Sequence, residues 1–72
     1  MTKQAAFEKI TALKPGEKAY INWMEESGGV VHRKEDGFEL YYVPLYGGDE
    51  QFEGSFSLTS VDAIIAQAYS WT

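Results

Sequence analysis

The stretch Phe38 to Phe56, FELYYVPLYGGDEQFEGSF, decides the fold of this chain. Its nineteen positions hold six of the eleven aromatic residues and three of the seven glycines. The first six positions alternate with a period of two, which is typical of a strand with one buried face. The two alternating sets are Phe38, Leu40 and Tyr42, and Glu39, Tyr41 and Val43. We expect the first set to face the core and the second set to point away from it.

The second half of the stretch changes character at Pro44, which has no amide donor and should bend the strand or end its pairing. Gly47 to Gln51 is then expected to form a polar loop. Phe52 to Phe56 is a candidate fourth strand, weakened by Gly54. The sequence leaves open whether this last segment pairs.

Two shorter strands are predicted before this stretch. Glu17 to Met24 alternates apolar and polar positions, and Val30 to Lys34 follows after a predicted turn at Glu25 to Gly29, EESGG. Lys34 to Gly37, KEDG, has the residue types of a hairpin turn into the main strand.

The register of that hairpin stays open between two alternatives. A two-residue turn at Asp36-Gly37 would place Lys34 opposite Glu39, whereas a three-residue loop ending at Gly37 would place Arg33 there. Either cross-strand pair of opposite charges would contribute about 0.2 to 1 kcal/mol.

Helices are predicted at both ends of the chain. Thr2 to Lys14 carries an apolar stripe, starts at a threonine N-cap and ends before Pro15-Gly16. The second helix is predicted from Thr59, which with Asp62 resembles a capping box. Its apolar stripe consists of Val61, Ile64, Ile65, Ala68 and Trp71.

These elements predict one compact α+β domain over residues 1–72, with no linker. The order is α-β-β-β(-β)-α, with an antiparallel sheet and both helices packed on one face. This order and length resemble the double-stranded-RNA-binding domain. Such domains grip phosphates with lysines at the start of their second helix, where this chain has Thr59 to Ala63, TSVDA. We therefore expect no direct nucleic-acid binding.

Composition narrows the class of protein further. The net charge is −5, from eleven acidic and six basic residues, which favours a protein partner with a basic surface. Cysteine is absent, no apolar run approaches the length of a membrane span, and the N-terminal segment MTKQAAFEKI lacks the apolar core of a signal peptide. The expected location is the cytoplasm, with no membrane association.

No pattern in the sequence indicates catalysis or a cofactor. His32 is the sole histidine, and no spaced ligands or nucleophile motif accompany it. Asp49, Glu50 and Glu53 lie among glycines in GGDEQFEG and could bind Ca²⁺ or Mg²⁺ weakly. A solvated acidic loop is the simpler interpretation. We expect a protein that is not an enzyme and holds no cofactor and no metal.

The sequence therefore predicts a small, acidic, non-catalytic protein-binding module. Tyrosines in excess of what so small a core can bury, together with carboxylates, would make the contact surface. The candidate partner-binding residues are Glu39, Tyr41, Tyr46, Asp49, Glu50 and Glu53. Size, charge and absence of cysteine resemble the phage and mobile-element inhibitors that block nucleic-acid-binding surfaces, including anti-CRISPR proteins. The alternatives are a structural homodimer and a weak divalent-metal or small-ligand binder at the acidic loop.

Overall fold

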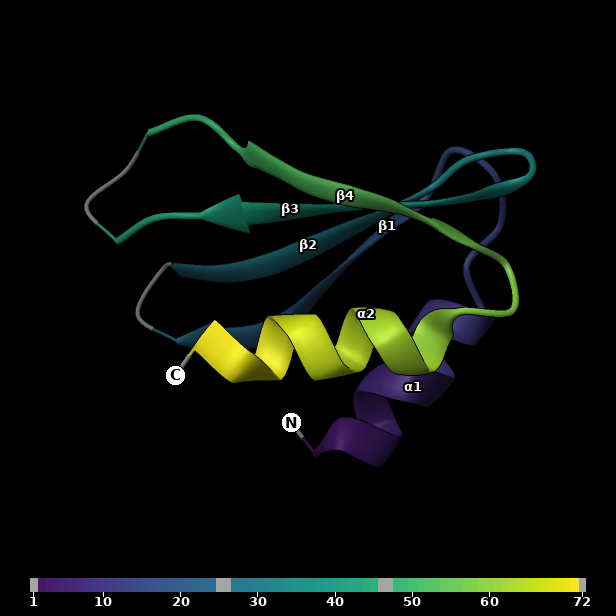
Figure 1. Cartoon of the computed structure of the whole chain (residues 1–72), viewed down its shortest axis with the longest axis horizontal. Helices are drawn as coiled ribbons and strands as arrows, with labels where there is room; N and C mark the ends of the chain where they lie inside the picture. The colour runs from purple at the N-terminus through teal and green to yellow at the C-terminus, as the bar shows by residue number, and fades with distance from the viewer. Residues whose placement is uncertain (1, 25–26, 46–47, 72) are drawn as a thin grey trace.

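Four antiparallel strands form one sheet, and two helices cover one of its faces (Figure 1). The computed structural model describes residues 2–24, 27–45 and 48–71. The elements in chain order are α1 (Lys3–Thr11), β1 (Lys18–Met24), β2 (Ser27–Arg33), β3 (Gly37–Val43), β4 (Gln51–Ser57), α2 (Val61–Ala68) and a 3-10 turn, η1 (Tyr69–Trp71). The predicted α+β fold is confirmed.

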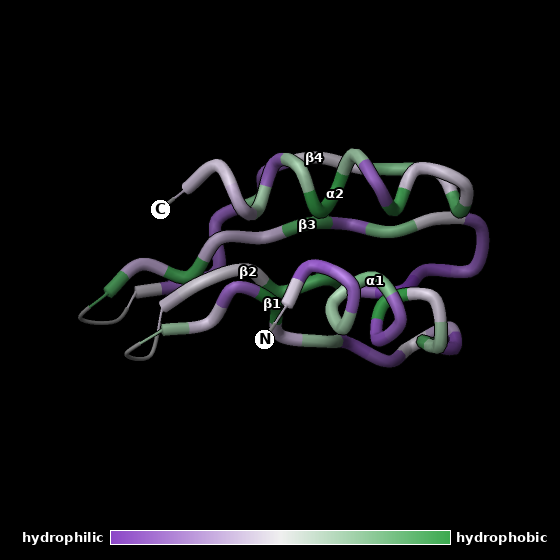
Figure 2. Tube along the Cα trace, turned by 90° about the horizontal axis from the view of Figure 1, so that it is seen from below, coloured by the Kyte–Doolittle hydropathy of each residue, from purple (hydrophilic) through white to green (hydrophobic). Residues whose placement is uncertain are grey.

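The sheet is a meander in which each strand pairs with the next along the chain, in the order β1-β2-β3-β4. The fourth strand that the sequence left open is therefore present. Helix α1 packs against β1, α2 packs against β4, and the two helices contact each other (Figures 1 and 2). Neither helix is both long and apolar enough to cross a lipid bilayer.

The core lies between the helices and the inner face of the sheet. Its strands contribute alternate positions, as the period of two requires, and its helices contribute their apolar stripes. The buried members are Ala6, Ile10, Ile21, Val31, Phe38, Leu40, Val61, Ile64, Ile65 and Ala68. Tyr42 shares this face and is half-buried, with its ring centroid 5.1 Å from that of Trp71. The predicted inward set of β3 is confirmed.

The helix ends differ from the expectation in two respects. Thr2 caps α1 as predicted, accepting a hydrogen bond from the amide of Ala5 at 3.1 Å, but the helix stops at Thr11, before Lys14. At α2 the predicted capping box of Thr59 and Asp62 is wrong, because the N-cap residue is Ser60. The hydroxyl of Ser57 lies 3.1 Å from that of Thr59 and 2.8 Å from that of Ser60. Ser57 thus competes for the hydroxyl that would have capped the helix.

The β2–β3 hairpin adopts neither predicted register. Arg33 pairs with Phe38, and His32 pairs with Glu39. The turn residues are therefore Glu35 and Asp36, and the Lys34 amide donates to the Gly37 carbonyl at 2.8 Å. The opposite-charge contact still forms, but diagonally, with Lys34 Nζ 3.7 Å from Glu39 Oε1.

The β1–β2 connection also differs from the predicted turn. Residues 25 and 26 lie outside the described part of the chain, while Gly28 and Gly29 belong to β2. An irregularity in β1 between Ile21 and Met24 breaks the expected alternation there. Asn22 adopts a positive φ of 49° and turns its amide towards α2, where Nδ2 donates to the Ala68 carbonyl at 2.9 Å.

Candidate functional site

The sheet face that the helices leave uncovered carries an apolar row across all four strands. Tyr20 of β1 pairs with Val30 of β2, Val30 pairs with Tyr41 of β3, and Tyr41 pairs with Phe52 of β4. The Tyr41 and Phe52 rings meet edge to face with centroids 5.6 Å apart. Trp23 extends the row, because its ring lies 4.9 Å from that of Tyr20. We call Tyr20, Trp23, Val30, Tyr41 and Phe52 the aromatic row.

The burial of Val30 shows how the row is packed. Its side chain is 0% exposed although it is not part of the core between sheet and helices. Directly opposite cross-strand neighbours have Cβ atoms about 5 Å apart, so Tyr20 and Tyr41 flank Val30 closely enough to shield it. Tyr20 and Phe52 remain 40% and 58% exposed. The open face therefore has a small packed centre with exposed aromatic groups at its margins.

A polar row runs beside the aromatic row. Lys18 pairs with His32, His32 pairs with Glu39, and Glu39 pairs with Ser55. The Tyr41 hydroxyl donates to Glu39 Oε1 at 2.8 Å, which joins the two rows.

His32 and Glu50 hold the segment before β4 against this face. His32 Nε2 lies 2.9 Å from Glu50 Oε1, and the His32 ring meets that of Tyr41 with centroids 4.8 Å apart. Glu50 precedes β4, so its contact with β2 brings this segment across β3. A hollow of about 570 Å³ is lined by Lys9, Tyr20, Trp23, Val43, Gly48 and Glu50.

The structure gathers half of the predicted site residues and separates others. Glu39, Tyr41 and Glu50 come together around His32, and exposed Asp49 precedes Glu50. Glu53 is the extra residue of a bulge in β4, and its carbonyl accepts a hydrogen bond from Gln67 of α2 at 3.4 Å. Tyr46 lies outside the described residues.

Sequence reasoning missed four contributors to this face, namely Trp23, Val30, His32 and Phe52. A regular alternation through β1 would place Trp23 on the same face as Ala19 and Ile21, and the irregularity at Asn22 turns Trp23 to the other face. The pairing of Tyr41 with Phe52 depends on the β4 bulge, for which Gly54 was the available signal. The sequence indicates no partner for His32, because Glu50 is eighteen positions away.

The pKa of the Tyr41 phenol is raised above its ordinary value of 10.0, chiefly because the hydroxyl donates to Glu39. Partial desolvation and the negative charges of Glu39 and Glu50 raise the pKa further. A raised folded-state pKa stabilises the protein below the unfolded value near 10, and this contribution is lost as pH rises through the folded value.

We expect a Glu39→Gln variant to lower the Tyr41 pKa towards 10, measured by NMR of the ring carbons from pH 8 to about 12. An unchanged titration in the variant would show that Glu39 does not control this phenol.

Within residues 2–24, 27–45 and 48–71, no three histidine, cysteine or carboxylate side chains come together in a way that could hold a metal ion. Comparison with protein-family models, with curated proteins and with solved structures finds no match to this chain. The physical character of the open face is therefore the basis for assigning a function.

Proposed function

We propose that this protein is a non-catalytic protein-binding module whose open sheet face docks onto a basic surface of a partner protein. The observation that carries the proposal is the aromatic row, which spans all four strands on the side away from the helices. Tyrosine and tryptophan are enriched in the centres of protein interfaces, because they bury much area and lose little conformational entropy.

The charges beside the row favour a basic partner. Glu39 and Glu50 lie along one side of it, and exposed Asp49 directly precedes Glu50, in a chain with a net charge of −5. Glu39 accepts a hydrogen bond from Tyr41 at 2.8 Å and lies 3.7 Å from the Lys34 ammonium, and Glu50 lies 2.9 Å from His32. Both carboxylate side chains remain about a third exposed and can meet an incoming cation. Such charges steer association and set its salt dependence more than they add affinity.

The docking face is also compatible with a more specific function, namely inhibition of a partner by blocking its nucleic-acid-binding surface. A compact acidic domain that covers a basic nucleic-acid-binding surface acts as an inhibitor, in the manner of anti-CRISPR proteins and other phage or mobile-element proteins working in the cytoplasm. Carboxylates would take the place of phosphates, while the aromatic row would supply the apolar contact.

Site-specific photo-crosslinking tests the docking face. A benzoylphenylalanine in place of exposed Phe52 should capture a protein from an extract of the cells that express this chain. The same group in place of exposed Ala66 on α2 should not capture it. Excess wild-type protein should compete with the capture, whereas a Tyr41→Ala variant should compete poorly. Capture from Ala66 alone, or capture of a second copy of this chain, would contradict the proposal, and the second outcome would favour the homodimer.

The captured partner then allows the charge complementarity to be measured. We expect its dissociation constant to rise by about tenfold or more between low and high salt. Asp49→Lys should weaken binding, while the matched reversal Asp62→Lys, at an exposed position on α2, should leave it unchanged. A partner that binds equally well in high salt, and equally well to both variants, would show that the carboxylates beside the row play no part.

A further inference from the structure

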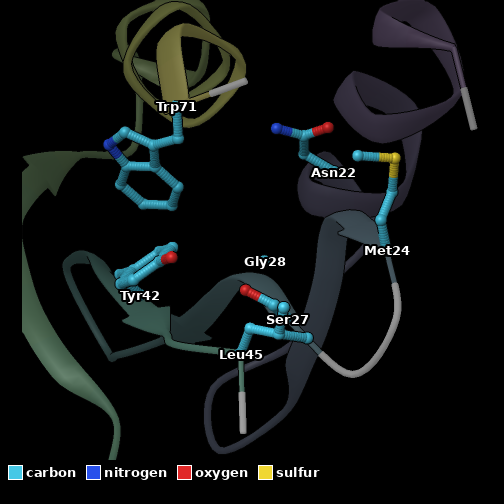
Figure 3. A pocket seen from close by; sticks show the side chains of 7 residues that line it. All are labelled: Asn22, Met24, Ser27, Gly28, Tyr42, Leu45 and Trp71. Carbon is cyan, nitrogen blue, oxygen red and sulfur yellow. The ribbon is translucent and has the colours of Figure 1, made fainter.

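A separate cleft opens at the end of the sheet, where β1, β2 and β3 approach η1 (Figure 3). Its volume is about 630 Å³, and its wall includes Asn22, Met24, Ser27, Tyr42, Leu45 and Trp71. Tyr42 and Trp71 pack on the helix side of the sheet, so this cleft is distinct from the aromatic row. An inference about it therefore stands independently of the proposed docking face.

Two aromatic rings form one wall of the cleft. The Tyr42 and Trp71 rings are inclined at 74° to each other, with centroids 5.1 Å apart. Figure 3 shows them on one side and Met24 on the opposite side, with Asn22 and Ser27 between. Aromatic faces attract cations through the ring quadrupole, and tryptophan does so most strongly.

Two polar side chains of the cleft donate hydrogen bonds within the protein, Ser27 its hydroxyl proton and Asn22 one of its two amide protons. Ser27 Oγ donates to the Val43 carbonyl at 2.7 Å, and Asn22 Nδ2 donates to the Ala68 carbonyl at 2.9 Å. Ser27 Oγ and Asn22 Oδ1 keep lone pairs that can accept hydrogen bonds. Burying such acceptors under a purely apolar ligand would cost free energy, because they would lose water without a replacement donor.

Charge also favours a cation in this cleft. Its lining residues are all uncharged, the chain as a whole carries −5, and η1 follows the C-terminal end of α2, where the helix dipole is negative. The chain already stacks three of its own cations on other rings, Lys3 on Tyr69, Lys18 on Tyr20 and Arg33 on Phe38, at 5.6 to 5.9 Å. Trp71 and Tyr42 instead contact each other.

We propose that the end cleft binds an organic cation of the alkylammonium class, such as a quaternary ammonium ion or the methylated amine of a lysine side chain. The ammonium group lies against Trp71 and Tyr42, and its carbon substituents contact Met24 and Leu45. Ser27 and Asn22 supply acceptor oxygens to its polarised C–H or N–H groups.

The first test is a titration with tetramethylammonium chloride, followed by amide and indole NMR shifts. The amides of Ser27, Gly28 and Tyr42 and the Trp71 indole should shift saturably, while sodium chloride at equal ionic strength should not reproduce the shifts. The neutral analogue 2,2-dimethylpropan-1-ol, similar in shape, should bind about tenfold more weakly. Equal binding of the alcohol, or absence of saturation with the cation, would overturn the proposal.

Two charge variants provide a matched pair. Met24 is 62% exposed at the cleft and Leu58, which does not line it, is 43% exposed, so a lysine fits either site without disturbing the core. Met24→Lys should weaken tetramethylammonium binding by about tenfold or more through repulsion of like charges, whereas Leu58→Lys should leave it nearly unchanged. Equal effects of the two variants would place the cation elsewhere on the molecule and refute the assignment.

A second ligand distinguishes between a small free cation and a methylated lysine side chain of another protein. A short peptide carrying trimethyllysine should bind more tightly than tetramethylammonium if the ligand is a protein side chain, because flanking backbone adds contacts. Equal affinities would assign the cleft to small free cations. Both results support an alkylammonium site. A peptide that binds where tetramethylammonium does not would owe its affinity to the flanking backbone, and that result would overturn the proposal.

Discussion

Replacing Gly28 with alanine should destabilise the fold by about 3 kcal/mol or more. The backbone of Gly28 has a φ of +150°, and an added Cβ would lie 2.6 Å from the Asn22 carbonyl oxygen and 2.8 Å from Cα of Trp23. Both neighbours are backbone atoms, which cannot move aside as the end of a flexible side chain could. The irregular part of β1 fits against β2 only because this position has no side chain.

The matched control is Gly16→Ala. Gly16 also has a positive φ, +92°, but an added Cβ there would meet nothing within 4 Å. It should cost about 1 kcal/mol from the backbone conformation alone. Chemical denaturation of both variants measures the difference, and equal losses of free energy of unfolding would show that the collision with β1 is relieved by a backbone shift.

Leu40→Ala should cost about 3 kcal/mol, within the range of 2 to 5 kcal/mol observed for buried leucines. Leu40 is 0% exposed at the centre of the inner sheet face, where neighbouring elements can collapse only partly into the space left. A domain of 72 residues is expected to have a free energy of unfolding of roughly 4 to 11 kcal/mol. The substitution should therefore remove a large part of the stability.

Leu58→Ala removes the same atoms from a side chain that is 43% exposed. We expect it to cost less than about 1 kcal/mol. Thermal or denaturant unfolding of the two variants compares their losses of free energy of unfolding. The difference between them is the contribution of close packing in the core, beyond the loss of apolar atoms that both share. Similar losses in both would mean that Leu40 does not occupy the centre of the core.

Periodic features of the sequence predicted the fold well. The alternation through Phe38, Leu40 and Tyr42 specifies the inner face of β3, because any shift by one residue would turn charged Glu39 inwards. The stripe containing Ile64, Ile65 and Ala68 predicted α2 for the same kind of reason.

The sequence was a poor guide where one residue interrupts a period or where small free energies compete. The irregularity at Asn22 and the bulge at Glu53 each insert a residue, and nothing in the alternation marks them. At the start of α2, three hydroxyl side chains compete for the same hydrogen bonds, so the cap could not be assigned from spacing. The turn residues are Glu35 and Asp36, whereas Gly37, the residue type most typical of such turns, favoured a turn placed one residue later.

The candidate site was predicted only in part for a related reason. Glu39 and Tyr41 could be assigned to the open face because they follow the period of β3. Their neighbours His32, Val30 and Phe52 come from other strands, and which residues meet across strands depends on register. Register was the property that the sequence left open.

The meander order of the strands determines at which stage of folding the complete open face forms. The four paired members of the aromatic row, Tyr20, Val30, Tyr41 and Phe52, each come from a different strand. Every strand pairs only with its neighbours along the chain, so the pairings are local and should form quickly. No single hairpin holds more than two of the four paired positions. A chain with only one hairpin formed would present at most two of these four positions, and a chain that lacks β4 would present three. A partner that contacts all four therefore distinguishes the completed sheet from partly folded chains.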